Sequence, residues 1–325
     1  MKTFSIKYLS NGPKNTGGFF HERFWFEQIQ QYYTDQGHKV NADAERPTHY
    51  HSGLWTKCQW FWHLFKVSDA DITIVPGRCA LPVLLRNLFT KRRVLVVLHS
   101  LNSTSLHKNK TLAFYYSFIF RLIKMRSNFF LVTVAEYWQT YFCEKKRIPS
   151  KRVLLLPNLF EAERYLEFKS AKKKLNIHLG MWSTKLDKVL YDIASRLSHR
   201  GYYCFFTTPE DIMSMGAYGY DIIYCPTINE YKTRVANALF TISIPAVPEG
   251  WSRVAHESFL LGTPVIGYNN AGLGELLHEA GGYIANNTDE VLQIIESKCE
   301  WKLSQTFVQK FHAERARQFL NRSGL

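Results

Sequence analysis

The stretch "LFTISIPAVPEGWSRVAHESFLLGTPVIGY", residues 239–268, contains a complete strand–helix–strand unit. Its first apolar run ends in a loop with two prolines, and Ser252 then offers a good N-cap for a helix over 253–261. Gly262 ends that helix, and the short apolar run 263–268 predicts the next strand. This order predicts a βαβ unit of a parallel sheet.

The same alternation extends over both halves of the chain. Short continuous apolar runs separated by helical segments are typical of a parallel sheet that is covered on both faces. We expect strands at 2–9, 72–75, 92–100, 129–136 and 152–158 in the first half, and at 176–182, 202–208, 239–245 and 263–268 in the second. The predicted fold class is α/β, with two doubly wound Rossmann-like domains.

The domain boundary is expected where charge becomes dense. The segment 161–175, "EAERYLEFKSAKKKL", is interpreted as a linker. We therefore assign 1–160 to an N-terminal domain and 161–302 to a C-terminal domain. One amphipathic helix is expected over 303–319, and the segment 303–325 is assigned to the first domain, against which it would pack. In such sheets ligands bind beyond the carboxyl ends of the strands.

Charge is distributed unequally between the two halves. Residues 1–160 hold 23 Lys and Arg against nine Asp and Glu, which accounts for the whole net charge of +14. Such asymmetry favours two modules with different partners, and the partner of the basic first module would be anionic. The alternative is a basic surface that only serves solubility.

The composition excludes several classes of protein. A 46% hydrophobic content is too high for a disordered chain. The six cysteines are far apart and form no C-x-x-C pair, so neither a zinc knuckle nor a disulfide framework is indicated. The sequence shows no signal peptide and no apolar run long enough to span a membrane, so we expect a cytoplasmic protein.

The loop and helix at 248–257 have the physical features of a phosphate site. Backbone amides at 251–253 lie at the positive end of the predicted helix, and Gly250 allows close approach of a ligand. Glu249 precedes these amides and Glu257 follows them, an arrangement that suits a nucleotide sugar. On the residues alone, a dipole-stabilising Glu249 and a solvated Glu257 are equally compatible with the pattern.

A longer pattern strengthens the nucleotide-sugar interpretation. Glu249-Gly250-Trp251, His256-Glu257, GTPVIG at 262–267 and AGLGEL at 271–276 resemble, in order and spacing, the signature of the retaining GT-B glycosyltransferases of family 4, with its E-x7-E motif. Weaker similarities are "LLLPNLF", "VLVVLHS" and "NTGGFF", at 154–160, 94–100 and 15–20. The resemblance implies a GT-B fold, with two Rossmann-like domains facing across a cleft that holds the substrates.

The resemblance also implies roles for single residues. Glu249 and His99 would be catalytic, with Glu249 on the donor sugar and His99 on a sugar hydroxyl. Glu257 would bind the ribose of the nucleotide. The diphosphate of the donor would be held by Gly250, Trp251, Ser252, Arg253, Gly272 and Leu273. Gly17 and Gly18, in the glycine loop after the first strand, would bind a phosphate or the acceptor.

The chain departs from the family pattern after the first strand of the second domain. The family commonly places an Arg and a Lys there, and this chain has Trp182 in place of the Arg. Lys185 is our choice for the remaining cation, with Lys188 second, and Arg253 is a candidate to compensate for the missing charge. An exposed Lys185 without a role is the alternative.

Metal binding is not expected. Asp69-Ala70-Asp71 spells the D-x-D of metal-dependent glycosyltransferases, but it directly precedes a strand and is interpreted as two solvated acids. We expect no cofactor, and a UDP- or GDP-sugar as co-substrate.

Two segments of the first half mix aromatic and basic residues. They are 114–130, "FYYSFIFRLIKMRSNFF", and 84–93, "LLRNLFTKRR". Such segments fit either a helix that contacts an anionic membrane surface or simply core aromatics.

The function expected is sugar transfer, with retention of configuration, from a nucleotide sugar to a lipid-linked or cell-surface polysaccharide precursor. A phage-type glycosyltransferase that acts on modified DNA bases is an alternative, as is a nucleotide-sugar sensor without turnover.

Overall fold

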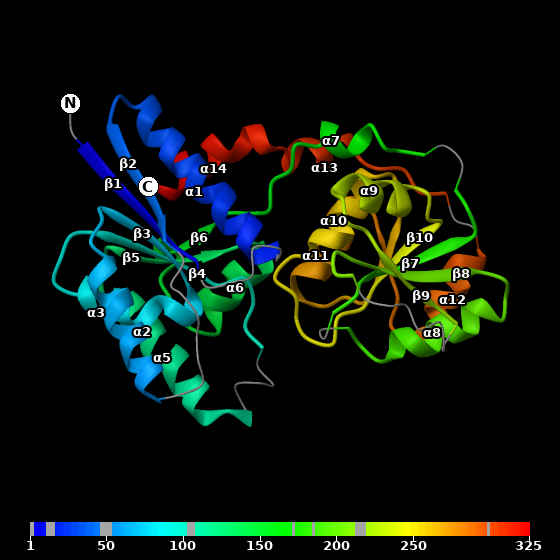
Figure 1. The fold of residues 1–325 in the computed structure, drawn as a ribbon, viewed down its shortest axis with the longest axis horizontal. Helices are drawn as coiled ribbons and strands as arrows, with labels where there is room; N and C mark the ends of the chain where they lie inside the picture. The colour runs from blue at the N-terminus through cyan, green and yellow to red at the C-terminus, as the bar shows by residue number, and fades with distance from the viewer. Residues whose placement is uncertain are drawn as a thin grey trace. The chain divides into compact units, whose positions relative to one another are not determined.

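The computed structural model describes residues 3–10, 17–45, 54–102, 108–170, 173–183, 186–211, 219–297 and 300–325. The chain forms two compact units (Figure 1). The first unit contains residues 1–158 and 314–325, and the second contains residues 159–313. Each is built on a six-stranded sheet whose strands are all parallel.

The first sheet has the strand order β2-β1-β3-β4-β5-β6. Its central strands carry almost only apolar residues, and four of the five residues of β4 are buried. The strands are β1 (Thr3–Leu9), β2 (Lys39–Glu45), β3 (Ile72–Pro76), β4 (Arg93–Val97), β5 (Phe129–Thr133) and β6 (Val153–Leu155). Chain order reverses between β1 and β3, so a crevice is expected beyond the carboxyl ends of these two strands.

Helices cover both faces of the first sheet. One face carries α1 (Gly17–Asp35) and α14 (Ala316–Ser323), which contact each other (Figure 1). The other face carries α2 (Leu54–Val67), α3 (Ala80–Arg86) and α5 (Lys110–Met125), with α3 in contact with both neighbours. The helix α6 (Glu136–Glu144) packs beside β5 and β6.

The second sheet has the strand order β12-β11-β10-β7-β8-β9. Its strands are β7 (Asn176–Met181), β8 (Tyr203–Thr208), β9 (Asp221–Tyr224), β10 (Phe240–Ser243), β11 (Val265–Gly267) and β12 (Tyr283–Ile284). Its helices are α7 (Glu163–Leu166), α8 (Val189–Ser198), α9 (Ile228–Ala236), α10 (Arg253–Leu260), α11 (Ala271–Ala280), α12 (Thr288–Glu296) and α13 (Gln305–Lys310). Chain order reverses between β7 and β10. The loop after β10 and the helix that follows it carry six of the predicted site residues: Glu249, Gly250, Trp251, Ser252, Arg253 and Glu257.

The segment 303–319 is not the single helix that its periodicity predicts. It forms α13, an extended stretch, the short 3-10 helix Ala313–Arg315 and the start of α14. The backbone of Phe160 interrupts the helix: its N–H donates to the carbonyl of Phe311, and its carbonyl accepts from the N–H of Ala313, both at 2.9 Å. Residues 303–313 consequently belong to the second unit, whereas 314–325 belong to the first.

No helix in the part of the chain that the structure describes is long and apolar enough to cross a membrane.

Candidate functional site

The N-terminus of α10 is formed as the sequence predicts. Ser252 is the N-cap, and its Oγ accepts a hydrogen bond from the N–H of Ala255 at 3.4 Å. The same Oγ lies 3.3 Å from the Oγ of Ser243, the last residue of β10. These contacts fix the helix start at the carboxyl edge of the second sheet, next to the reversal between β7 and β10.

Glu257 is buried and its carboxylate is held by two side chains. One oxygen accepts from the guanidinium of Arg253 at 3.0 Å, and the other accepts from the Tyr231 hydroxyl at 3.0 Å. Burial, together with the nearby charge of Glu257, raises the pKa of Tyr231 well above its usual value, so its hydroxyl stays a donor. The Tyr165 hydroxyl also interacts with this carboxylate. A carboxylate has about four lone-pair sites, so Glu257 keeps acceptor capacity for a hydroxyl of a ligand.

The guanidinium group of Arg253 points toward the interior of the second unit. Besides donating to Glu257, its guanidinium carbon lies 4.8 Å from the centre of the Phe160 ring. The positive charge that the sequence suggested for the leaving diphosphate is thus already neutralised by a carboxylate of the same helix.

The side chain of Trp251 belongs to the core. Its indole N–H donates to Nδ1 of His256 at 3.0 Å, and its ring packs 4.9 Å from that of Phe311. His256 is itself enclosed by Phe160 and Phe307, and burial lowers its pKa well below the usual value. A contribution of Trp251 to ligand binding can therefore come only from its backbone.

Gly250 and Gly272 bring two loops into direct contact. A Cβ at position 272 would lie 1.7 Å from the carbonyl oxygen of Gly250, so only glycine fits there. The N–H of Gly272 donates to the carbonyl of Glu249 at 3.1 Å, and that of Leu273 donates to Asn270 at 3.1 Å. The amides of Gly272 and Leu273, which the resemblance assigns to the diphosphate, thus already donate within the protein. Half-buried Glu249 is held beside the start of α11.

The position of the usual Arg is occupied by a packed aromatic residue. The Trp182 ring lies 5.2 Å from that of Phe206 and 6.2 Å from those of Tyr191 and Tyr220. Lys188 is exposed at the start of α8. Lys185 lies outside the described residues.

In the first unit, Gly18 and His99 come together. Gly17 is the first residue of α1, and a Cβ on Gly18 would lie 3.2 Å from Nε2 of His99, which follows β4. The same Nε2 lies 3.2 Å from a carboxylate oxygen of Glu22. The other oxygen of Glu22 accepts from the Tyr8 hydroxyl at 2.9 Å.

This arrangement adds residues that the sequence did not single out. Glu22 lies on α1 one turn after Gly18, and it is 6% exposed. Tyr8 comes from β1, and in the second unit Tyr231 on α9 has the same role beside Glu257. The helical spacing between Gly18 and Glu22 is the one signal that could have suggested Glu22. Nothing in the sequence indicates that Glu22 lies next to His99.

The D-x-D acids have structural partners, so their interpretation as two solvated acids is wrong for Asp71. Asp71 accepts from both the backbone N–H and the hydroxyl of Ser5, each at 2.8 Å, which ties the start of β3 to β1. Asp69 is exposed and pairs with Arg92. Among the described residues, no group of three or more His, Cys, Asp or Glu side chains is arranged to hold a metal ion.

Comparison with known proteins establishes the fold class. No protein-family model and no curated protein matches the chain. Solved structures match over nearly its whole length. HepE of Anabaena, solved in complex with UDP and glucose, is 14% identical with a TM-score of 0.70, covering 99% of this chain and 100% of that one. A glycosyltransferase of Rickettsia africae is 16% identical with a TM-score of 0.62, covering 99% and 94%.

A third similar structure is the UDP-GlcNAc 2-epimerase of Methanocaldococcus jannaschii, 12% identical with a TM-score of 0.57, covering 99% of this chain and 100% of that one. The chain therefore has the GT-B fold. Since proteins of different activity share this fold, the reaction has to be argued from the site.

Proposed function

We propose that the protein is a glycosyltransferase that moves a sugar from a nucleoside diphosphate sugar, a UDP- or GDP-sugar, to an acceptor. The observation that supports this most is the α10 segment, where Glu249, the capped helix start and the buried Glu257 follow β10 at the reversal of the second sheet. The occurrence of this E-x7-E spacing in a GT-B fold makes the donor site the simplest interpretation.

Within this proposal the three parts of the segment bind three parts of the donor. Glu257, fixed by Arg253 and Tyr231, accepts hydrogen bonds from the ribose hydroxyls. The α10 start binds the diphosphate through its backbone amides and its positive dipole end. Glu249 accepts from a hydroxyl of the transferred sugar.

In the first unit, His99 binds a hydroxyl of the reacting sugar. Gly17 and Gly18 leave room for a phosphate or the acceptor beside it, since an added Cβ on Gly18 would meet the imidazole ring. Lys185 is proposed as the cation for the leaving diphosphate.

The finer parts of the proposal concern stereochemistry and acceptor. We propose retention of the anomeric configuration without a metal ion, with catalysis by positioning and by stabilisation of the leaving group. The acceptor is a lipid-linked or cell-surface polysaccharide precursor at the cytoplasmic face of a membrane, for which the excess of Lys and Arg in the first half offers a complementary surface.

A panel of UDP- and GDP-sugars tests the proposal. The nucleotide sugar that raises the melting temperature most, by mass action on the folded state, is then incubated with acceptor extracts. Transfer of the labelled sugar supports the proposal. No stabilisation and no transfer with any member of the panel would overturn it.

A nucleotide-sugar sensor is the second candidate. Two observations favour it: Trp182 is packed among aromatics where the usual Arg would stand, and the charge of Arg253 is paired with Glu257. Tight binding of the nucleotide sugar without release of the nucleotide, in the presence of acceptor extracts, identifies the sensor.

A further inference from the structure

The outer side of α2 is aromatic where a surface helix is normally polar. Trp55 and Trp62 are 74% and 59% exposed, and among the described side chains of this helix only Leu64 is buried. One side of the helix forms what we term the α2 stripe, which borders a hollow of the surface and consists of Trp55, Cys58, Gln59, Trp62, His63 and Lys66. Exposed apolar side chains rimmed by polar ones mark interaction sites.

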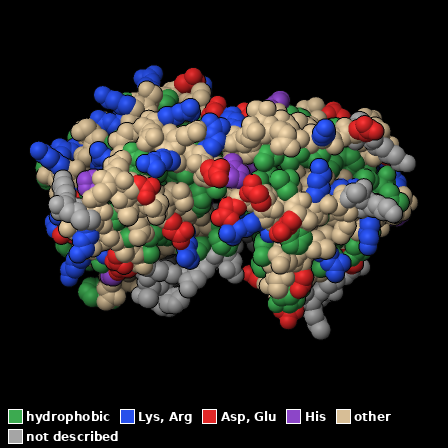
Figure 2. Space-filling view, turned by 90° about the horizontal axis from the view of Figure 1, so that it is seen from above, with side chains coloured by type: hydrophobic (Ala, Val, Ile, Leu, Met, Phe, Trp, Pro, Cys, Tyr) green, Lys and Arg blue, Asp and Glu red, His purple; other side chains and the backbone are tan. Residues whose placement is uncertain are grey.

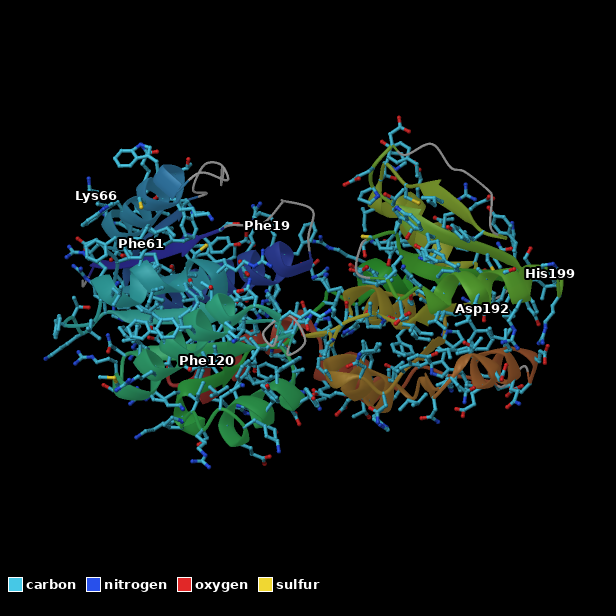
Figure 3. The ribbon with its side chains drawn as sticks, turned by 90° about the horizontal axis from the view of Figure 1, so that it is seen from below. Phe19, Phe61, Lys66, Phe120, Asp192 and His199 are labelled. Atoms are coloured by element: carbon cyan, nitrogen blue, oxygen red, sulfur yellow. The ribbon has the colours of Figure 1, made fainter. Side chains whose placement is uncertain are left out.

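The segments next to α2 on the same face of the sheet also have exposed apolar side chains. Phe89, which follows α3, is 89% exposed, and Phe114 and Met125 on α5 are 74% and 65% exposed. The helices α2, α3 and α5 lie side by side on one face of the first sheet, which Figure 3 shows with Phe61 and Lys66 on α2 and Phe120 on α5. The apolar side chains therefore belong to one helical layer.

The stretch of sequence that contains this layer carries a strong excess of positive charge. Residues 46–135 contain thirteen Lys and Arg but only two acids, Asp69 and Asp71. Glu45, the acid just before this range, pairs with His63 of the α2 stripe and with Lys7. Asp69 is paired with Arg92, and Asp71 accepts from Ser5. Figure 2 shows the molecule from the side opposite to that of Figure 3. On this opposite side, acidic as well as basic side chains lie at the surface.

We propose that the α2 stripe, with Phe89 and Phe114, docks on the surface of an anionic lipid bilayer. Trp and Phe side chains insert at the level of the lipid head groups, and the surrounding Lys and Arg attract anionic lipids. A nucleic-acid duplex would complement the charge, but its bases are stacked inside and its phosphates offer nothing to Phe89 or Phe114. A second copy of the chain would bring two like-charged layers together.

Flotation with vesicles tests this surface directly. The wild-type protein is mixed with vesicles of phosphatidylcholine, or of phosphatidylcholine containing about one third phosphatidylglycerol. We expect flotation with the anionic vesicles alone, and a loss of at least about tenfold in binding for Trp55→Ser/Trp62→Ser. Lys66→Glu is a second variant, in case the double variant does not fold.

The matched control is Tyr224→Ser/Ile228→Ser, which removes two exposed apolar side chains from the second unit and should leave flotation unchanged. Absence of wild-type flotation, unchanged binding of the stripe variants, or binding to duplex DNA in preference to vesicles would each overturn the proposal. Because no nucleotide sugar is present, a negative result here leaves the proposed sugar transfer untouched.

A separate observation concerns the buried network around His99. We infer that Glu22 is a positioning residue that fixes the tautomer of His99, an inference whose functional meaning rests on the proposed function. A carboxylate only accepts hydrogen bonds, so Nε2 of His99, 3.2 Å away, has to carry the proton. Nδ1 is then the acceptor atom of the ring.

Tyr8 and His21 complete the surroundings of this pair. The Tyr8 hydroxyl donates to the second oxygen of Glu22, and burial and the charge of Glu22 raise the pKa of Tyr8, which keeps the hydroxyl a donor. The His21 ring stands edge-on to His99, with ring centres 4.9 Å apart. With its proton directed to Glu22, His99 offers an acceptor to a sugar hydroxyl.

Nitrogen NMR of histidine-labelled protein at alkaline pH tests this inference without substrate. We expect the Nε2–H tautomer in the wild type, assigned with His99→Asn. In Glu22→Gln the new amide can donate to Nε2, so the Nδ1–H tautomer should dominate. Tyr8→Phe leaves the carboxylate in place and should keep the wild-type tautomer.

An Nδ1–H tautomer in the wild type, or the same tautomer in Glu22→Gln, would disprove the positioning role. Because the spectra need no nucleotide sugar, this result is separate from that of the transfer assay. If the protein is a transferase, Glu22→Gln should also lower kcat while leaving nucleotide affinity unchanged.

Discussion

Each unit of the protein contains a buried glutamate that is held in the same way. In the second unit, Glu257 accepts from the Tyr231 hydroxyl and from Arg253. In the first, Glu22 accepts from the Tyr8 hydroxyl and from His99. Arg253 lies on the same helix as Glu257, four residues earlier, whereas His99 comes from a strand end 77 residues after Glu22. One centre is local in sequence and the other is assembled by the fold.

The difference has chemical consequences. Arginine is always charged, so the pair in the second unit is a permanent ion pair that orients a carboxylate for a ligand. Histidine has two inequivalent nitrogens, so the carboxylate in the first unit orients an imidazole instead. In the first unit the glutamate orients the histidine, whereas in the second unit the arginine orients the glutamate.

Replacement of Glu249 should have the largest effect, because this half-buried acid faces the transferred sugar in our proposal. We expect Glu249→Ala to lower kcat about 1000-fold, the effect of removing one preorganised polar contact at a reacting centre. Nucleotide affinity, measured by calorimetry, should stay within about threefold of the wild type. An equal loss of nucleotide affinity would place Glu249 on the nucleotide instead.

The two glycines that adjoin these centres should respond differently to a methyl group. A Cβ added at Gly272 would lie 1.7 Å from the carbonyl oxygen of Gly250, whereas a Cβ added at Gly18 would lie 3.2 Å from Nε2 of the His99 side chain. Backbone cannot yield as a side chain can, so we expect Gly272→Ala to lower the free energy of unfolding by about 3 kcal/mol and Gly18→Ala by less than about 1 kcal/mol. Denaturant unfolding measures both, and equal losses would contradict this distinction.

Glu257→Ala should weaken nucleotide binding about 30-fold, since the ribose loses a charged acceptor. Glu230→Ala, which removes an exposed acid of α9 in the same unit, is the control and should bind as the wild type does. The measurement is calorimetric titration with UDP and GDP. Unchanged affinity in Glu257→Ala would disprove the assignment of this carboxylate to the ribose.

Acid should destabilise the second unit through its buried histidines. His178 on β7 lies between the hydroxyls of Thr207 and Thr241, 3.1 Å from each, and burial lowers its pKa to about 3. The unfolded chain binds a proton at its ordinary pKa, so stability is full above that value and falls as the pH decreases from about 6.5 toward 3.

From His178 alone, the loss at pH 5 is on the order of 2 kcal/mol. Urea unfolding at pH 7.5 and pH 5 measures it, and His178→Gln should flatten the dependence. A pH-independent stability of the wild type would refute this linkage.

Features that depend on a short stretch of residues could be predicted from the sequence. Apolar runs predicted nine of the strands, and the α10 cap and helix follow directly from Ser252 and Gly262. The edge strand β2 was missed because its polar sequence, "KVNADAE", lies largely exposed and lacks an apolar run. The helix predicted over 303–319 failed because Phe160 pairs with its middle, a contact between residues far apart in the chain.

The candidate site divides in the same way. Glu249 and Glu257 could be found from spacing, because they lie within one strand–loop–helix segment. Glu22 and Tyr8 could not, since only the order of β1, β3 and β4 in the sheet brings them to His99. The inward direction of Arg253 was also unpredictable, because it depends on the positions of Phe160 and Tyr231 around Glu257.

The pairing of Phe160 with residues 311–313 also has a consequence for biosynthesis. It joins the two ends of the second unit, so residues 159–313 form a closed insertion within the first unit. During synthesis this insertion is complete before α14 leaves the ribosome. The second unit can fold as soon as its own chain is available, whereas the first has to wait for its last helix, although its synthesis began earlier.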